Sequence, residues 1–154
     1  MNDTIKYIES LSLAFGGVYT SIAENAREIE ISSAEDVLSA EEMDYIVKRI
    51  GIKKKECYRN ALLIAQYLGC EYCEGYVNVC FPIEHAFNRR NGKYFDLTIT
   101  DRSEYVVFGE YSFDDALNAM GRTYGNVFLK KYNNNEREQR PMGWLSRRQR
   151  SPED

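Results

Sequence analysis

The apolar positions over residues 4–30 recur three or four residues apart, which is the spacing of one face of an α-helix. Gly16-Gly17 interrupts this pattern, so we expect two helices rather than one. Further along, Ser39 and Glu42 have the spacing of a capping box, a motif that starts a helix. That helix should end at Gly51 and carry Met43, Ile46, Val47 and Ile50 on one face.

A further helix is predicted from about Cys57 to Leu68, after the charged loop 53–56. Gly69 follows its last apolar residue and should stop it, because glycine is the common residue just past a helix end. The inward positions of this helix are expected to be Ala61, Leu62, Ala65 and Leu68.

From residue 71 onward the apolar period shortens to two, which predicts β-strands. Residues 71–81 alternate, with Tyr72 and Tyr76 on one face and Cys73 and Val77 on the other. Segments 83–90 and 93–100 should form a hairpin around Asn91-Gly92, a pair typical of two-residue turns. The remaining expected elements are a strand over 105–109, a helix from Ser112 to Met120 and a short strand over 127–129.

These elements predict one α+β domain over residues 1–132. In it, N-terminal helices and the helix headed by Cys57 pack on an antiparallel sheet of about four strands. The length of 154 residues and the 44% of hydrophobic residues are enough for a single core. Residues 133–154 are rich in Arg and have no apolar periodicity, so we expect a flexible tail there.

Charge and composition narrow the classes of function. A net charge of -4 disfavours a general nucleic-acid binder. No apolar run reaches the ~18 residues of a membrane span. Met1–Lys6 lacks the basic start and apolar run of a signal peptide, so we expect a cytoplasmic protein without a membrane partner. In that compartment the four cysteines should be thiols rather than disulfides. The oligomeric state is left open.

Three residues form a candidate nucleophilic site. Cys57 stands at the predicted start of a helix, where unpaired backbone N–H groups and the helix dipole favour a thiolate. His85 is the one histidine of the chain. If Arg90 pairs with Lys93 across the turn, His85 and Asp96 point to the same face as diagonal neighbours. A slip of one residue in this register would separate them.

The three side chains suit nucleophilic catalysis. In this arrangement Cys57 is the nucleophile, His85 the general base and acid, and Asp96 the group that orients the imidazole. Taken singly, each residue has a structural explanation, such as a buried thiol or a strand-end cap. Their order and register together favour the catalytic interpretation.

The amino-acid sequence around the three residues resembles that of the papain-like, transglutaminase-like superfamily. The similar segments are ECYRNALLIA, EGYVNV, EHAFN and GKYFDLT, within residues 53 to about 109. The resemblance implies a Cys at a helix start, followed by a sheet that supplies His and then Asp. It also implies acyl transfer on an amide, ester or thioester of a protein or peptide-like substrate, as in proteases, deamidases, transglutaminases and acyltransferases, without a cofactor.

The chain departs from the family pattern at three positions. Gly51 stands six residues before Cys57, in the region where papain-like proteases carry a Gln that stabilises the oxyanion. Phe87 and Leu97 stand where Trp and Pro are common in relatives. These departures bear on the substrate more than on the three site residues.

Two other interpretations stay open. Cys70, Cys73, Cys80 and His85 are four potential zinc ligands within sixteen positions. Cys73 and Cys80 fall on opposite faces of the predicted strand, however, so we expect no metal site. The second alternative is a non-catalytic protein-binding module that keeps the fold and presents a surface of tyrosines. The tyrosines in question are Tyr72, Tyr76, Tyr94, Tyr105 and Tyr111.

Overall fold

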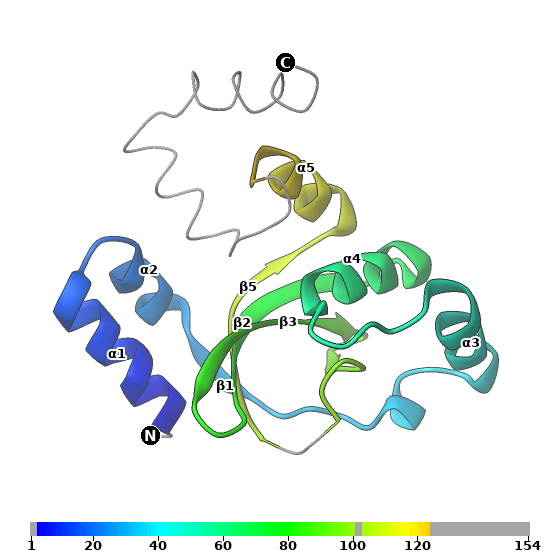
Figure 1. The fold of residues 1–154 in the computed structure, drawn as a ribbon, viewed down its shortest axis with the longest axis horizontal. Helices are drawn as coiled ribbons and strands as arrows, with labels where there is room; N and C mark the ends of the chain where they lie inside the picture. Colours follow the sequence, from blue (N-terminus) through cyan, green and yellow to red (C-terminus); the bar gives the residue numbers. More distant parts are fainter. Residues whose placement is uncertain (1–2, 101–102, 124–154) are drawn as a thin grey trace.

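The computed structural model describes residues 3–100 and 103–123. The predicted strand over 127–129 and the predicted tail from residue 133 lie outside the described residues. The described residues form an α+β fold of five α-helices and a curled antiparallel sheet of five strands (Figure 1). No helix among them combines the length and apolar character that a membrane span needs.

The N-terminal segment folds into two helices, as predicted. Helix α1 spans Asp3–Phe15 and helix α2 spans Val18–Asn25. Gly16 and Gly17 separate them with positive φ angles of 59° and 54°, a conformation that favours glycine. The helical expectation was wrong after residue 26, because Arg27–Ile29 form strand β1. This segment has a single apolar residue, Ile29, so the apolar period does not distinguish a helix from a strand there, and its pairing with residues 105–107 makes it a strand.

The capping box at Ser39 is confirmed in both of its hydrogen bonds, 3.1 Å from Glu42 N to Ser39 Oγ and 2.9 Å from Ser39 N to Glu42 Oε1. It starts helix α3, Ala40–Tyr45, which widens into a π-helical turn over Ile46–Ile50 and ends at Gly51. Of the four apolar residues expected to share one face, Ile46 is buried, whereas Val47 is 58% exposed.

Helix α4 spans Cys57–Leu68, with the predicted bounds. Gly69 ends it in the left-handed conformation, with φ of 67°. Its buried face is slightly rotated from the predicted one and includes a polar residue: Cys57, Asn60, Ala61, Ile64 and Ala65.

The sheet consists of β1, β2 (Glu71–Asn78), β3 (Pro82–Arg90), β4 (Lys93–Phe95) and β5 (Glu104–Tyr111). Their spatial order is β1-β5-β2-β3-β4, and all neighbours are antiparallel. The expected number of about four strands was therefore one short, because β1 adds an edge beside β5.

The β3–β4 hairpin has the predicted register, with Arg90 opposite Lys93. Asn91 and Gly92 form its turn with φ angles of 52° and 81°. The second arm is shorter than predicted, because β4 ends at Phe95 and residues 96–100 leave the sheet. Hydrogen bonds from the backbone N–H groups of this segment to the Asp96 side chain replace the ladder, as described below.

The sheet curls until its two ends meet. Beyond β1, Ile31 forms a parallel bridge with Tyr94 of β4, and Ser32 N donates to Tyr94 O at 2.7 Å. The curl gives the sheet an inner face filled by a separate apolar cluster. The members of this cluster are Cys73, Val77, Phe87, Tyr94, Tyr105 and Val107.

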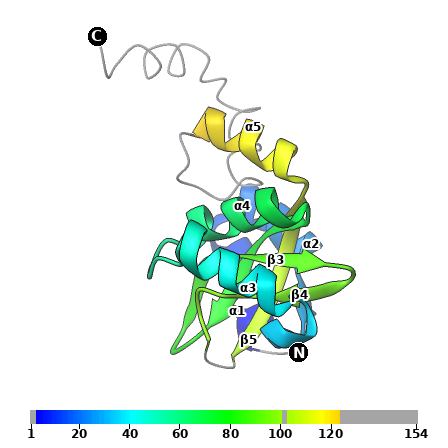
Figure 2. The same cartoon turned by 90° about the vertical axis from the view of Figure 1, so that its right-hand side faces the viewer.

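Helices cover the outer face of the sheet. Helix α4 packs on β2 and β3, and α1 and α2 pack near β5 and β2, while α3 lies at the opposite end of the molecule from α1 and α2 (Figure 1). Helix α5, Phe113–Thr123, begins where Ser112 Oγ accepts from Asp115 N at 3.1 Å, the predicted cap. Figure 2 shows α4 and α5 stacked on the same side of the sheet.

Candidate active site

Cys57 occupies the first position of α4 and is buried, with 9% of its surface exposed. The chain reaches it through a tight turn in which Lys55 takes a positive φ of 64°. Glu56, the residue that caps the helix, makes no side-chain hydrogen bond to the first turn. The N–H groups at this helix start therefore have no capping side chain, and they lie beside the thiol.

His85 lies in the middle of β3, and Asp96 lies just past the end of β4. His85 Nε2 and Asp96 Oδ2 are 2.7 Å apart, and their side chains are 3% and 1% exposed. The two meet as the register predicted, although Asp96 belongs to the loop rather than to the strand. This pair is thus a short, water-excluded contact between an imidazole and a carboxylate.

The Cys57 side chain completes the group, because it lies close enough to His85 to raise the pKa of the imidazole. Because Nε2 bonds Asp96, Nδ1 is the ring nitrogen left for the thiol. Because β4 ends early, it leaves His85 without a partner on that strand. In the β3–β4 ladder, β4 pairs only with Asn88–Arg90, so His85 lies beyond the stretch of β3 that β4 covers.

The protonation of His85 follows from these contacts. Burial lowers the pKa of His85, but hydrogen bonds to Asp96 and Cys57 and the charges of both partners outweigh burial and raise that pKa to about 9. His85 is therefore an imidazolium at neutral pH, placed between a carboxylate and a thiol. An imidazolium in contact with a thiol favours the thiolate.

Asp96 is held by four donors. One oxygen, Oδ1, accepts from the backbone N of Thr98 at 2.9 Å and of Ile99 at 3.3 Å. The other, Oδ2, accepts from the Tyr105 hydroxyl at 2.5 Å and bonds His85. With both oxygens occupied, the carboxylate has one orientation, and it fixes the imidazole in turn.

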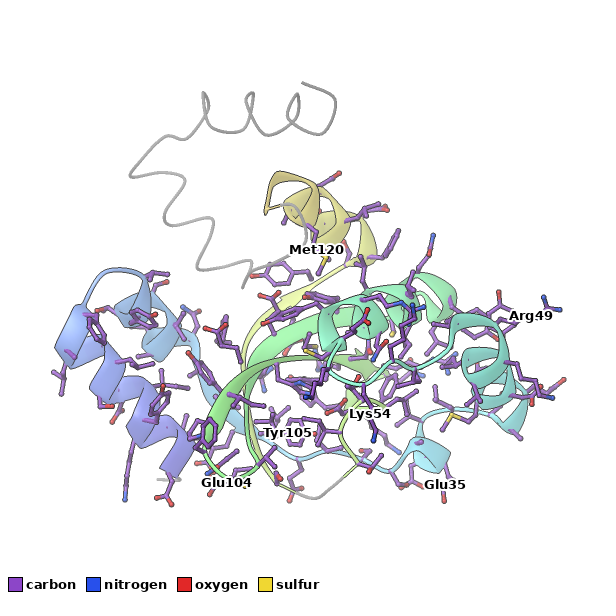
Figure 3. The ribbon with its side chains drawn as sticks, viewed as in Figure 1. Glu35, Arg49, Lys54, Glu104, Tyr105 and Met120 are labelled. Carbon is purple, nitrogen blue, oxygen red and sulfur yellow. The ribbon has the colours of Figure 1, made fainter. Side chains whose placement is uncertain are left out.

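Tyr105 escaped the sequence analysis as a site residue. Its ring belongs to the inner apolar cluster and lies 6.2 Å from the His85 ring, centroid to centroid, and Figure 3 shows it among the side chains enclosed by the sheet. The alternating pattern placed it on a strand, but nothing in the pattern indicates that its hydroxyl meets Asp96, because β5 and β4 are not neighbours in the sheet.

Asn60 is the second residue that sequence reasoning missed. It is fully buried one turn after Cys57 and hydrogen-bonds both to the loop before α4 and to the loop after β4. A signal was present, since an Asn three residues after the thiol, next to Ala61, falls on the face of the helix that packs inward.

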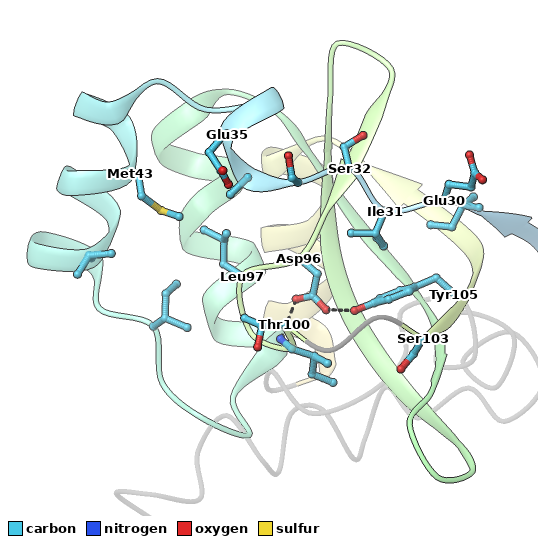
Figure 4. A pocket seen from close by; sticks show the side chains of 16 residues that line it. Glu30, Ile31, Ser32, Glu35, Met43, Asp96, Leu97, Thr100, Ser103 and Tyr105 are labelled. Carbon is cyan, nitrogen blue, oxygen red and sulfur yellow. Dashed lines mark hydrogen bonds between the residues drawn. The ribbon is translucent and has the colours of Figure 1, made fainter.

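A cavity of about 810 Å³ lies next to Asp96 and Tyr105 (Figure 4). Its other walls come from the chain after β1, from α3 with the turn that follows it, and from the loop after β4. Cys57 and His85 do not line it. The cavity therefore borders the carboxylate side of the site rather than the thiol side.

The other cysteines are placed in different surroundings. Cys70 packs in the core under α4, Cys73 belongs to the inner cluster of the sheet, and Cys80 is exposed in the β2–β3 turn. Burial raises the pKa of Cys70 to about 12 and that of Cys73 higher still. Within residues 3–100 and 103–123, no group of three or more His, Cys, Asp or Glu side chains is arranged to hold a metal ion.

Four of the five tyrosines considered as a binding surface are buried. Tyr72, Tyr76, Tyr94 and Tyr105 are 0%, 3%, 7% and 3% exposed, so they fill the core on both faces of the sheet. The alternative of a tyrosine-rich binding surface therefore loses four of its five rings, because strand alternation tells which face a ring is on, but not whether that face is covered.

Comparisons with known proteins give no relative: no family model, no curated protein and no solved structure matches the chain.

Proposed function

We propose that this protein is a thiol-dependent acyl-transfer enzyme in which Cys57 is the nucleophile, His85 the general acid and base, and Asp96 the orienting group. The observation that carries the proposal is that one buried imidazole hydrogen-bonds a carboxylate at 2.7 Å and lies near a thiol at the start of a helix, close enough for the thiol to raise its pKa. The combination of three polar groups in this order is the arrangement that nucleophilic catalysis requires.

The first step is attack of the Cys57 thiolate on the carbonyl carbon of an amide, ester or thioester. A C–S bond forms, and the carbonyl π electrons move onto oxygen. Backbone N–H groups at the start of α4, which no Glu56 side chain occupies, are suited to stabilise that oxyanion. When the tetrahedral intermediate collapses, the bond to the leaving group breaks, and the His85 imidazolium gives its proton to the departing nitrogen, oxygen or sulfur.

The second step frees the enzyme. A water or an amine attacks the Cys57 acyl thioester while neutral His85 removes its proton. Collapse of this second intermediate breaks the C–S bond and restores the thiolate beside an imidazolium. Hydrolysis and transfer share this chemistry and differ only in the acceptor. The three side chains supply the nucleophile and the proton carrier, so the proposed reaction uses no cofactor.

The resemblance to the papain-like, transglutaminase-like superfamily supports the same assignment. The helix that begins with the cysteine and the order Cys57, His85, Asp96 along the chain agree with that pattern. A protein or peptide-like acyl substrate and a cytoplasmic setting, where the thiol stays reduced, belong to the proposal on this basis. The tyrosine surface that suggested a binding module is largely buried, so no specific observation favours that alternative.

The test is alkylation by iodoacetamide, with each cysteine followed by mass spectrometry from pH 5 to pH 10. Cys80 is exposed and serves as the internal reference. Because the imidazolium favours the thiolate, the rate ratio of Cys57 to Cys80 should be highest at low pH and fall as pH rises. At pH 6, His85→Ala should lower the Cys57 rate about tenfold or more, leaving Cys80 unchanged.

The buried thiols provide a second control in the same experiment. Cys70 and Cys73 have raised pKa values, so both should react slowly at every pH in this range. A Cys57 that reacts as slowly as these two, with the same rate in wild type and in His85→Ala, would refute the proposed nucleophile.

A further inference from the structure

The first turn of α4 is joined to the loop that carries Asp96 by a single buried amide. Asn60 Nδ2 donates to Thr98 Oγ1 at 2.9 Å, across 38 positions of sequence. The Asn60 side chain is fully buried, and Cys57 lies three residues earlier on the same helix face. The nucleophile and the carboxylate loop thus have a direct connection besides the imidazole.

The amide of Asn60 has a partner for each of its hydrogen-bonding positions. Nδ2 also donates to Lys53 O at 2.8 Å, and Oδ1 accepts from Lys53 N at 3.2 Å and from Arg59 Nη1 at 3.0 Å. Two of these bonds hold the loop that leads into Cys57. An amide with four partners and no exposed surface has one orientation, so the position of Thr98 relative to the helix is fixed.

The contacts close into a ring. Thr98 accepts from Asn60 through Oγ1 and donates its backbone N–H to Asp96 Oδ1 at 2.9 Å. Asp96 bonds His85 at 2.7 Å, His85 lies beside Cys57, and one helical turn leads from Cys57 back to Asn60. A shift of α4 against the loop would therefore change the Cys57–His85 contact unless the Asn60–Thr98 bond breaks.

We propose that Asn60 is a positioning residue for the acyl transfer: its hydrogen bond to Thr98 sets the distance between Cys57 and the His85–Asp96 pair. This inference rests on the proposed function. It gives the buried amide a role beyond stability, because displacement of a reacting atom by about 1 Å is enough to lower a rate strongly.

The test removes the Asn60–Thr98 bond from the loop side. Thr98→Val replaces the hydroxyl by a methyl group of similar size and keeps the backbone N–H bond to Asp96, whereas Thr98→Ser restores a hydroxyl. Thr100→Val makes the same replacement at an exposed position of the same loop and is the matched control. Far-UV circular dichroism and thermal melting show whether each variant is folded.

Two readouts separate positioning from a merely structural role. The first is the alkylation rate of Cys57, and the second is the NMR titration of His85, which gives one signal because the chain has one histidine. Thr98→Val should lower the Cys57 rate at pH 7 roughly two- to tenfold, the range of one hydrogen bond. It should also lower the His85 midpoint, because contact with the thiolate helps to hold the imidazolium. Thr98→Ser and Thr100→Val should match the wild type in both.

The outcomes are distinct. If Thr98→Val melts at a lower temperature but keeps the wild-type Cys57 rate and His85 midpoint, Asn60 is structural only and the inference is overturned, while the proposed function stands. If Cys57 of the wild type shows no selective reactivity, the proposed function fails. The His85 titration still tests the inference in that case. If the Asn60–Thr98 bond sets the distance between Cys57 and His85, its loss in Thr98→Val must shift the His85 midpoint, and an unchanged midpoint overturns the inference.

Discussion

Two carboxylates of this molecule, Asp96 and Glu110, each bind a tyrosine hydroxyl and a cationic side chain, and they differ in which cation they bind. Asp96 accepts from Tyr105 and from His85, and the Asp96 and His85 side chains are 1% and 3% exposed. Within the described part of the chain, its cationic partner is thus an imidazole from which water is excluded.

Glu110 lies on β5 and has two arginine partners. It accepts from Arg27 Nη2 at 2.6 Å, from Arg89 Nη1 at 3.0 Å and from the Tyr94 hydroxyl. Both guanidinium groups also lie over the Tyr94 ring, 5.7 Å and 5.4 Å from its centroid. The Arg27 side chain is 56% exposed, so water reaches this cluster.

The difference shows that the pKa of the cationic partner decides whether a charged cluster can transfer a proton. The charge of Glu110 raises the pKa of Arg89 above its already high value, so this cluster holds its protons at any ordinary pH. The pKa of His85 is raised only to about 9, within reach of proton transfer, and its second nitrogen meets a thiol. The Glu110 cluster thus links β1, β3, β4 and β5 and keeps its protons. The Asp96 cluster differs from it because His85 can give up a proton.

The largest expected effect comes from neutralising each carboxylate in turn. Asp96→Asn should lower the free energy of unfolding at pH 7 by about 3 kcal/mol, because it leaves a buried imidazolium without its counter-ion. Glu110→Gln should cost only about 1 kcal/mol, since its arginines are partly solvated. Urea denaturation measures both. Equal losses would mean that burial does not separate the two clusters.

The second effect is the pH dependence of stability. The pKa of His85 is about 9 in the folded protein, against an ordinary value of ~6.5 when unfolded. A raised pKa stabilises the fold fully below the unfolded value, and the contribution is lost as pH rises through the folded value. About 3 kcal/mol should therefore disappear between about pH 6.5 and pH 9.

The buried thiols Cys70 and Cys73 also destabilise the fold as pH rises, so a matched variant is needed. Asp96→Asn removes the largest of the influences that raise the pKa of His85 and leaves both thiols in place. The difference in unfolding free energy between wild type and Asp96→Asn should therefore shrink as pH rises from 6.5 to 9. A difference that stays constant would contradict an imidazolium at neutral pH.

The residues of the two clusters were not equally predictable from the sequence. Cys57 and His85 were found because a helix start after a charged loop and a two-residue turn are local patterns, and the Asn91-Gly92 turn fixes the register as far as Phe95. The strand was expected to continue to residue 100, yet Asp96 turns its carboxylate back onto the N–H groups of Thr98 and Ile99. Asp residues favour such local bonds, but the sequence does not tell where they replace a ladder.

Contacts between distant segments account for what the sequence could not show. The Glu110 cluster depends on Arg27, whose segment was predicted to be helical, and on the curl that brings β1 back toward β4. Tyr105 contacts Asp96, and Asn60 contacts Thr98. Both contacts depend on the path of the loop after β4, which tertiary packing fixes. Apolar periods of 2 and 3.6 residues tell which face of a strand or helix a side chain lies on, but not which distant residue it contacts.

The smallest effect concerns the two tyrosines and tests how each carboxylate uses its hydroxyl. Tyr105→Phe removes one donor from Asp96 Oδ2 and keeps the ring that packs on Phe87. It should lower the free energy of unfolding by about 1 kcal/mol, the net value of a hydrogen bond. With one donor fewer, the oxygen that faces His85 carries more negative charge, so the pKa of His85 should rise slightly. Tyr94→Phe, the matched change at Glu110, should cost a similar free energy and leave the His85 titration unchanged. Urea denaturation and the single-histidine NMR titration measure the two quantities. A lower pKa of His85 in Tyr105→Phe would show instead that the hydroxyl holds Asp96 in place for the imidazole, and Tyr105 would then join Asn60 as a positioning residue.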